Sequence, residues 1–300
     1  MNGYAIETSG LTKRYGNVEA VTDLTLAVKP QAITGFIGRN GAGKSTTIKM
    51  LLGMVRPSAG SGRVLGDNID VASESVALRR KLAYVGEDKG LYAYLTVGAM
   101  IQFMRSFYGD WRPDVEQRLL RMYQLPLERK VKALSKGMRT KLALLLALSR
   151  RPELLILDEP TEGLDPVSIE ELLQTLSGLG SEGTTIFFSS HQLADVERVA
   201  DDILMIDRGR IVMDMSLDEM REKYRRITLG FDHQPQPDNF QMPGVERVRC
   251  SGRQITVMAS SLADEVVARG RSLGAVSVDV APVSLREVFL ETVQGDSQSR

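Results

Sequence analysis

The feature that most constrains the fold of this chain is a glycine-rich loop between two patterned segments. Residues 38–46 read GRNGAGKST; they follow an apolar run at 33–37 and precede residues 47–52, whose pattern predicts a helix. In a strand–loop–helix arrangement, the backbone N–H groups of the loop and the helix N-terminus converge on an anion. We therefore expect the phosphates of a nucleoside triphosphate here, with Lys44 at the β- and γ-phosphates and Ser45 at magnesium. The residues expected to bind are Gly38, Arg39, Asn40, Gly41, Ala42, Gly43, Lys44, Ser45 and Thr46.

Composition and charge exclude several other classes of protein. The 300 residues are 43% hydrophobic and 25% charged, which gives room for one large domain and a small one. Lys+Arg and Asp+Glu are both 38, so no excess positive charge favours a nucleic-acid partner. Cys250 is the single cysteine, which excludes an intrachain disulfide and fits a reducing compartment. The start of the chain has no signal-peptide pattern, and the longest apolar run, 142–148, is far short of the ~18 residues of a membrane span, so we expect a soluble, cytoplasmic chain.

Two further segments place polar side chains at the ends of buried strands. Residues 154–157 are apolar on both faces, as in a parallel strand, and end in Asp158 and Glu159. Carboxylates at the carboxyl end of such a strand lie where open α/β sheets bind ligands, so Asp158 is placed to hold magnesium through water and Glu159 to polarise an attacking water. His191 follows the buried run 184–190 at the same sheet edge, where an imidazole can contact the γ-phosphate.

Other residues leave two interpretations open. Tyr15, on a turn upstream of the loop, either packs on its own hairpin or provides a platform for base stacking. Glu87 and Asp88 either form a solvated acidic pair or reach a metal or water. Ser135 and Gly137 precede a predicted helix at 139–149 and are a potential anion site.

The helical segments before that site also leave a choice. Residues 96–108 and 114–123 carry apolar side chains at a spacing of three and four, which predicts amphipathic helices. Their stripes either pack in the core or form a docking face for a partner.

In order and spacing, these motifs resemble the nucleotide-binding subunits of ABC transporters over residues 4–220. The resemblance assigns the Walker A motif to 38–46, the Walker B motif to 154–158, the catalytic glutamate to Glu159, the signature loop to 134–138, the D-loop aspartate to Asp165, the switch histidine to His191 and the adenine-stacking aromatic to Tyr15. It implies an α/β fold: a P-loop NTPase (RecA-like) core with an antiparallel β subdomain and an inserted α-helical subdomain at about 96–150.

The resemblance also implies a mechanism. Such subunits are similar in forming a head-to-tail dimer around two ATP molecules with Mg²⁺. Each nucleotide would lie between one subunit's Walker A motif and the other's Ser135 and Gly137, and Asp165 is also expected to bind nucleotide. The implied activity is ATP hydrolysis that powers transport through a separately encoded integral membrane permease, with the chain at the cytoplasmic face of the membrane. The dimer is either a homodimer or a heterodimer with a second ATPase subunit.

Two positions depart from the family pattern. The signature loop has Lys136 where glycine is commonest and Met138 where glutamine is, while Ser135 and Gly137 are retained. The position of the Q-loop glutamine is occupied by Glu87, whose carboxylate can still ligate magnesium.

The C-terminal region predicts a second domain. We expect the ATP-binding domain at 1–220, a linker at 221–244 because of its prolines and few apolar residues, and a small α+β domain at 245–300. The last domain contains a hairpin, a helix, a strand and a final helix opened by the capping pair Ser284 and Glu287. Its role is either dimerisation or regulation, or it packs without a function of its own.

Two other functions would require different sequence features. A soluble ABC ATPase acting on ribosomes or DNA usually has two such domains or long coiled-coil insertions, and neither occurs in this sequence. A small-molecule P-loop kinase would lack the 134–138 motif and His191. The transported substrate is not encoded in this chain, because specificity would reside in the permease.

Overall fold

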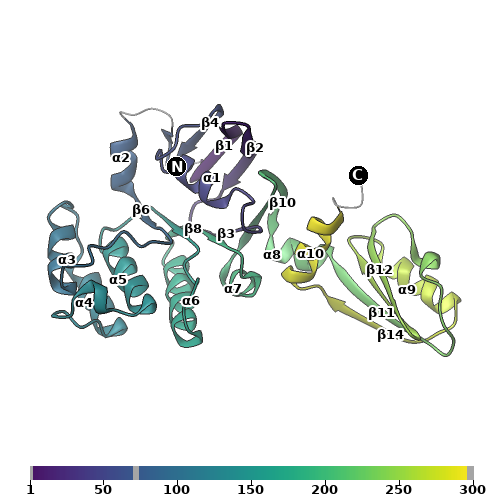
Figure 1. Ribbon diagram of the computed structural model, residues 1–300. Helices are drawn as coiled ribbons and strands as arrows, with labels where there is room; N and C mark the ends of the chain where they lie inside the picture. Colours follow the sequence, from purple (N-terminus) through teal and green to yellow (C-terminus); the bar gives the residue numbers. More distant parts are fainter. Residues whose placement is uncertain (1–2, 70–73, 296–300) are drawn as a thin grey trace. The chain divides into compact units, whose positions relative to one another are not determined.

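The computed structural model describes residues 3–69 and 74–295. Residues 1–2 and 70–73 of the predicted first domain, and the last five residues of the predicted C-terminal domain, lie outside the described residues. The chain divides into two compact units, Met1–Asp214 and Met215–Arg300 (Figure 1). Within the described part, no helix is both long and apolar enough to cross a membrane.

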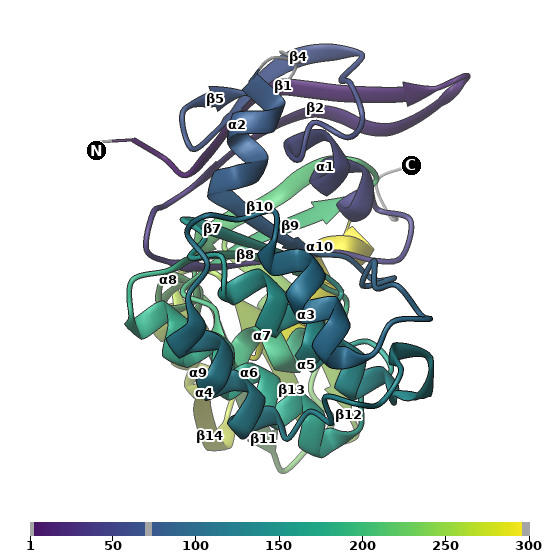
Figure 2. The ribbon, with the colours of Figure 1, turned by 90° about the vertical axis from the view of Figure 1, so that its left-hand side faces the viewer.

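The first unit contains an antiparallel sheet near its N-terminus. The strands pair in the order β2-β1-β4-β5 and comprise β1 (Ile6–Tyr15), β2 (Val18–Val28), β4 (Ala59–Val64) and β5 (Asp67–Asn68). One face packs on α1 (Lys44–Leu51), which lies between this sheet and a second, larger one (Figure 2). Leu11, Leu24, Ile48 and Leu51 are fully buried in that shared core.

The second sheet of this unit has six strands in the order β10-β9-β3-β8-β7-β6. They are β3 (Ile33–Ile37), β6 (Leu82–Val85), β7 (Leu154–Asp158), β8 (Thr185–Ser190), β9 (Asp202–Asp207) and β10 (Arg210–Ser216). From β9 through β6 the pairings are parallel, and every residue of β3, β7 and β8 is buried. Since parallel strands end at one edge, the loops after β3, β6, β7 and β8 meet there.

Helices cover the opposite face of the six-stranded sheet and form a separate cluster beside it (Figure 1). The covering helices are α6 (Pro166–Ser181) and α7 (Leu193–Val199), and α2 (Glu74–Lys81) leads into β6. The cluster contains α3 (Val97–Arg105), α4 (Pro113–Tyr123), a 3₁₀ turn at Val131–Ala133 and α5 (Lys136–Leu148). Buried Glu116 joins α3 to α4 by accepting hydrogen bonds from Arg105 and Trp111. The predicted inserted helical subdomain is confirmed.

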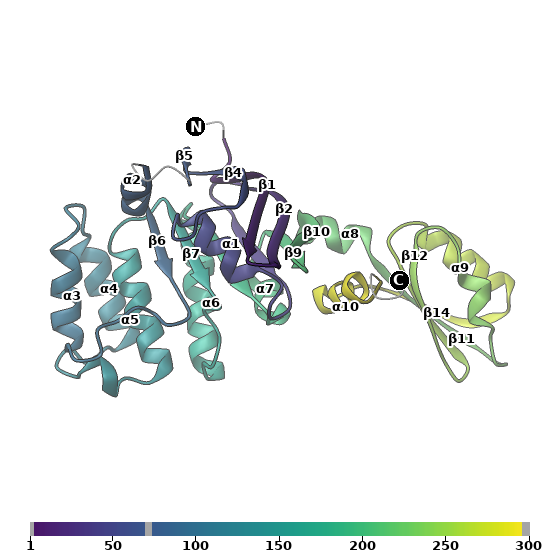
Figure 3. The same ribbon diagram turned by 45° about the horizontal axis from the view of Figure 1, so that its top comes forward.

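The second unit is a four-stranded antiparallel sheet with helices (Figure 3). In chain order it contains α8 (Leu217–Lys223), β11 (Arg225–Phe231), a 3₁₀ turn at Pro237–Phe240, β12 (Val245–Ser251), β13 (Gln254–Ala259), α9 (Ala263–Ser272), β14 (Ala275–Pro282) and α10 (Leu285–Gly295). The strand order is β12-β13-β11-β14, and α9 covers one face. Ser284 and Glu287 form the predicted capping pair of α10 through reciprocal hydrogen bonds.

The structure corrects the prediction of a linker over residues 221–244. β11 lies inside that range and is a central strand, paired with both β13 and β14. Its alternating side chains Ile227, Leu229 and Phe231 are buried, as is Phe240 further along. The prolines that suggested a linker follow the strand, so the predicted segment combined a buried strand with the loop after it. The unit boundary accordingly lies at Asp214, before the predicted residue 220.

Candidate functional site

The glycine-rich loop joins β3 to α1 through positions that only glycine fits. Gly43, the N-cap of α1, has φ of 111°, and a Cβ there would lie 2.6 Å from the carbonyl oxygen of Ala20. Lys44 follows it and is 6% exposed; its Nζ turns back and donates to the carbonyl oxygen of Gly38 at 2.8 Å. The loop and the first turn of α1 therefore form one closed cradle with its backbone N–H groups at a helix N-terminus.

Asp158, the last residue of β7, faces the first turn of α1. Its Oδ1 accepts hydrogen bonds from Ser45 Oγ at 3.4 Å and from Ser189 Oγ at 2.6 Å. Only 4% of Asp158 is exposed, so the two hydroxyls stabilise a carboxyl group that is almost completely removed from water. The side chains of Ser45 and Asp158 thus supply oxygen atoms side by side, as a hard divalent cation requires.

Glu159, directly after β7, joins the loop to the end of β8. Its Oε1 lies 3.1 Å from Lys44 Nζ, and its Oε2 lies 2.8 Å from His191 Nδ1 and accepts the backbone N–H of His191 at 3.2 Å. Lys44 and Glu159 are both buried, so the pair is weakly screened by solvent. Lys44, Glu159 and His191 therefore form one connected network at the carboxyl edge of the sheet.

A cavity of about 340 Å³ opens beside this network, and we call it the phosphate cavity. Its lining comprises Ala20, Arg39, Asn40, Gly41, Gly43, Lys44, Ser45, Thr46, Glu87, Glu159, Glu162 and His191. Most of the residues predicted from the glycine-rich loop are thus brought together with the predicted glutamate and histidine. Gly38 and Ala42 belong to the loop but do not line the cavity. Asp158 does not line it either, but it accepts a hydrogen bond from Ser45, which does.

The signature loop lies at the start of α5 and does not line the phosphate cavity. Ser135 is the N-cap, and its Oγ accepts the N–H of Met138 at 3.2 Å. The helix begins at Lys136, three residues before the predicted start, because this cap closes its first turn. A Cβ on Gly137 would lie 2.8 Å from Ser168 Oγ, which itself donates to Asp165 Oδ2 at 2.7 Å.

These contacts bring the signature loop against the D-loop of the same chain. The ammonium group of Lys136 lies against Gly163, because a Cβ added at Gly163 would be 2.7 Å from Lys136 Nζ. Burial, and then the charge of Lys136, lower the pKa of Lys89. Lys136 thus lies against Gly163, and its charge acts on Lys89 in the loop after β6.

Comparison with known proteins agrees with this geometry. The family model described as ABC transporter matches residues 21–162. The bacitracin transport ATP-binding protein BcrA of Bacillus licheniformis is 37% identical over 224 residues, which are 74% of this chain and 72% of that protein. The uncharacterized ABC transporter ATP-binding protein YcbN of Bacillus subtilis (strain 168) is 30% identical over 313 residues, covering 99% of both chains. The chain belongs to the ABC transporter family.

A solved structure supports the same assignment. It is described as the ATP binding subunit of an ABC transporter, and it matches with a TM-score of 0.66 and 33% identity over 73% of this chain and 92% of that one. The chain is thus an ATP-binding, ATP-hydrolysing subunit of this family, with the P-loop fold predicted from its sequence. These relatives favour a transporter subunit over the alternative of an ATPase acting on ribosomes or DNA.

Tyr15 is not brought to the phosphate cavity. It ends β1, is 49% exposed, and its ring lies 5.1 Å from Lys13 Nζ without lining the cavity. Base stacking by Tyr15 therefore stays a prediction.

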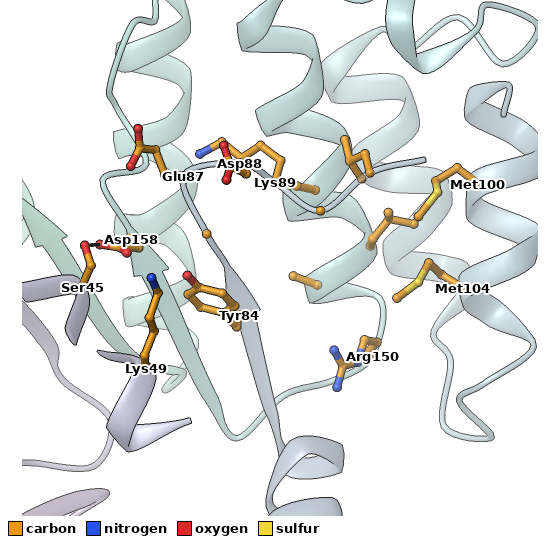
Figure 4. A pocket seen from close by; sticks show the side chains of 16 residues that line it. Ser45, Lys49, Tyr84, Glu87, Asp88, Lys89, Met100, Met104, Arg150 and Asp158 are labelled. Carbon is orange, nitrogen blue, oxygen red and sulfur yellow. Dashed lines mark hydrogen bonds between the residues drawn. The ribbon is translucent and has the colours of Figure 1, made fainter. Parts of the chain in front are cut away.

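Glu87, in the loop after β6, lines the phosphate cavity and also a second cavity of about 510 Å³. We call the latter the subdomain cavity because α3 and α5 form one wall. Figure 4 shows Ser45, Asp158 and Glu87 at one side and Met100, Met104 and Arg150 at the other. Ser45 and Glu87 line both cavities, so the loop after β6 connects the helical subdomain to the nucleotide site.

Two residues of the site were not predicted from the sequence. Glu162 lines the phosphate cavity, and fully buried Ser189 bonds to Asp158. A signal for Ser189 was present: a hydroxyl inside a strand otherwise buried on both faces needs a polar partner. That partner is fixed by the β7–β8 register, which pairs Asp158 with Ser189.

Proposed function

We propose that this chain is the ATP-hydrolysing subunit of a transporter, and that it dimerises around ATP to drive a substrate through a separate membrane permease. In this proposal the first unit is the ATP-binding domain, with residues of about 96–150 as its helical subdomain, and the chain works at the cytoplasmic face of a membrane. The observation that carries the proposal is the network beside the phosphate cavity, in which the buried pair of Lys44 and Glu159 is joined by the more exposed His191.

The network gives each residue a distinct task in hydrolysis. The glycine-rich loop and Lys44 bind the phosphates, and Lys44 neutralises charge there. The carboxylate of Glu159 orients the attacking water and accepts its proton. His191 holds Oε2 of that carboxylate through both its ring and its backbone N–H, which fixes the direction in which Glu159 acts.

The residues also fit a magnesium ion. Ser45 and Asp158 present adjacent oxygen atoms, and the carboxylate of Glu87 lines the same cavity as Ser45. When bound, the ion neutralises charge on the β- and γ-phosphate oxygens. The side chains of Asp158 and Ser45 would hold it.

A second subunit completes the site in this proposal. Ser135 and Gly137 stand apart from the phosphate cavity of their own chain, together with Asp165 and Ser168. A head-to-tail dimer places such a cluster over the partner's nucleotide, so ATP is enclosed only when two subunits close. The second subunit is either another copy of this chain or a related ATPase.

The permease docks on the helical subdomain in this proposal. Tyr92, Tyr94, Phe103 and Phe107 form a continuous series of ring contacts, with centroids 5.0–5.9 Å apart, which we call the aromatic ladder. Tyr94 and Phe107 are 70% and 65% exposed, which is unusual for side chains of this size unless they meet a partner. Leu91 and Met100, near the ladder in sequence, line the subdomain cavity, which shares Ser45 with the phosphate cavity.

The function is tested by Glu159→Gln, with Glu162→Gln as the matched control. Both glutamates line the phosphate cavity, but of the two only Glu159 contacts Lys44 and His191. Loss of a general base lowers kcat by about 10²–10⁴-fold, so Glu159→Gln should bind ATP, turn over slowly and accumulate as a dimer in sedimentation experiments. Glu162→Gln should keep wild-type turnover. Normal turnover in Glu159→Gln would remove Glu159 from its proposed role.

A further inference from the structure

Ser189 connects the two carboxylates of the site, and it is fully buried in β8. Its Oγ donates to Asp158 Oδ1 at 2.6 Å and accepts the backbone N–H of Glu159 at 3.0 Å. The residue therefore touches the proposed metal-binding side chain and the backbone of the proposed water-activating residue at once. It lies behind both and does not line the phosphate cavity.

The direction of these hydrogen bonds follows from which groups can donate a proton. A hydroxyl has one proton to give and two lone pairs to accept with, while the N–H of Glu159 can only donate. Ser189 therefore gives its proton to Asp158. The second donor to the same oxygen is Ser45. Among the residues that the structure describes, no hydrogen bond or ion pair occupies Oδ2 of Asp158, so its lone pairs are available to a ligand.

The second contact concerns the backbone of Glu159. This residue has φ of 48°, in the left-handed region that non-glycine residues rarely occupy. The N–H at that position is buried, and Ser189 Oγ is its acceptor. In this conformation the Glu159 carboxylate extends to Lys44 and His191, so the hydroxyl stabilises the backbone geometry that aims the carboxylate.

We propose that Ser189 is a positioning residue for ATP hydrolysis, which sets the orientation of Asp158 toward the metal and of Glu159 toward water with a single hydroxyl. The inference rests on the roles proposed above for those two residues. Ser189 contacts neither the nucleotide nor the metal; its effect passes entirely through Asp158 and Glu159.

The neighbouring Ser190 provides a matched control. It is also fully buried at the end of β8, but its Oγ accepts the N–H of Gln192 at 2.9 Å and touches neither carboxylate. Removal of a partner that orients a metal ligand costs about 10–100-fold in metal affinity or activity. We expect Ser189→Ala to raise the Mg²⁺ concentration for half-maximal ATPase rate, and to lower kcat, by a factor in that range. Ser190→Ala should change neither quantity, and Ser189→Thr should restore both.

The dependence on Mg²⁺ distinguishes a positioning role from a purely structural one, because a general structural defect would not change it selectively. Nucleotide affinity without metal, measured with a fluorescent ATP analogue, should stay at the wild-type value in Ser189→Ala. If that variant does not fold, Ser189→Cys keeps the size of the side chain with a weaker donor, and it should show the raised Mg²⁺ requirement.

Two results would overturn the inference. One is a wild-type Mg²⁺ requirement and kcat in Ser189→Ala or Ser189→Cys. The other is an equal loss in Ser190→Ala. Failure of the proposed function is distinguishable, since it would appear as normal turnover in Glu159→Gln. An inactive Glu159→Gln beside a normal Ser189→Ala would reject the role of Ser189 alone.

Discussion

The phosphate cavity and the subdomain cavity adjoin each other and share Ser45 and Glu87, yet their charged groups are arranged in opposite ways. In the phosphate cavity the charged groups pair with one another: buried Lys44 and Glu159 form an ion pair, and Glu159 also contacts the more exposed His191. In the subdomain cavity, titratable groups stand beside apolar side chains such as Met100 and Leu146.

The pKa shifts in the subdomain cavity follow from that environment. Burial lowers the pKa of Lys89 and of Arg150, because each loses water around its charged form. Burial, reinforced by Asp158, Asp88 and Glu87, raises the pKa of Tyr84 to about 12, so its hydroxyl stays protonated at neutral pH. These are the shifts of groups in a partly desolvated pocket.

The two cavities thus offer different chemical environments. A site that performs chemistry needs groups held in advance in fixed positions, which mutual pairing provides. A site that receives a partner needs apolar surface and charge that the partner can complement. The loop after β6 contributes Glu87 to the lining of both cavities.

The largest difference between the two cavities is expected when one lysine is removed from each. Lys44 lines the phosphate cavity and Lys49 the subdomain cavity, and both lie on α1. Charge-assisted hydrogen bonds contribute about 1.5–3 kcal/mol each, so Lys44→Ala should weaken ATP binding about 100-fold or more. Lys49→Ala should bind ATP normally. Isothermal titration with ATP measures both, and equal affinities in the two variants would contradict the assignment of the phosphate cavity.

The aromatic ladder allows a test of intermediate size. Phe107→Ser removes an exposed ring of the ladder, and Met122→Ser, on α4, removes a large exposed apolar side chain outside it. Burial of a phenylalanine contributes about 1.5–3 kcal/mol, so Phe107→Ser should weaken copurification with the permease about 10-fold or more. The ATPase rate of the isolated subunit should be unchanged.

The control variant sharpens that test. Met122→Ser should copurify with the permease as the wild-type chain does. A similar loss in both variants, or no loss in either, would mean that the permease does not dock on the ladder.

The smallest effect is expected at Tyr15. Stacking of a base on an aromatic ring is worth about 1–3 kcal/mol, and for a half-exposed ring we expect the lower end, a several-fold loss of ATP affinity in Tyr15→Ala. Tyr4→Ala, which removes a similarly exposed tyrosine, is the control. The loss should vanish when tripolyphosphate replaces ATP, because that ligand has no base. Unchanged ATP affinity in Tyr15→Ala would mean that Tyr15 serves only its own hairpin.

The sequence predicted those parts of the site that depend on local order. The glycine-rich loop, Asp158, Glu159 and His191 each follow a strongly apolar strand, and parallel strands bring such ends to one edge. The fold class followed from the same motifs through the family resemblance, and it is confirmed. The roles of the individual residues stay predictions until the variants are measured.

The parts that the sequence did not predict depend on contacts between distant segments. The contact of Ser189 with Asp158 depends on strand register, and that of Lys136 depends on the position of Gly163 on another loop. β11 was missed because its alternation of Ile227, Leu229 and Phe231 is only seven residues long and runs into a proline-rich loop. Its burial comes from β13, β14 and α9, which follow it in the chain.

The most direct test of the account is a pull-down of tagged Glu159→Gln from native membranes in mild detergent with ATP, with partners identified and counted by mass spectrometry. Because this variant should hold ATP without turning it over, it should retain the complex in its closed form. The account predicts a polytopic membrane protein at near-equal stoichiometry, present with ATP and reduced when Phe107→Ser is added. Ribosomal proteins or DNA-repair factors, with no membrane protein, would contradict it and leave only the ATPase chemistry standing.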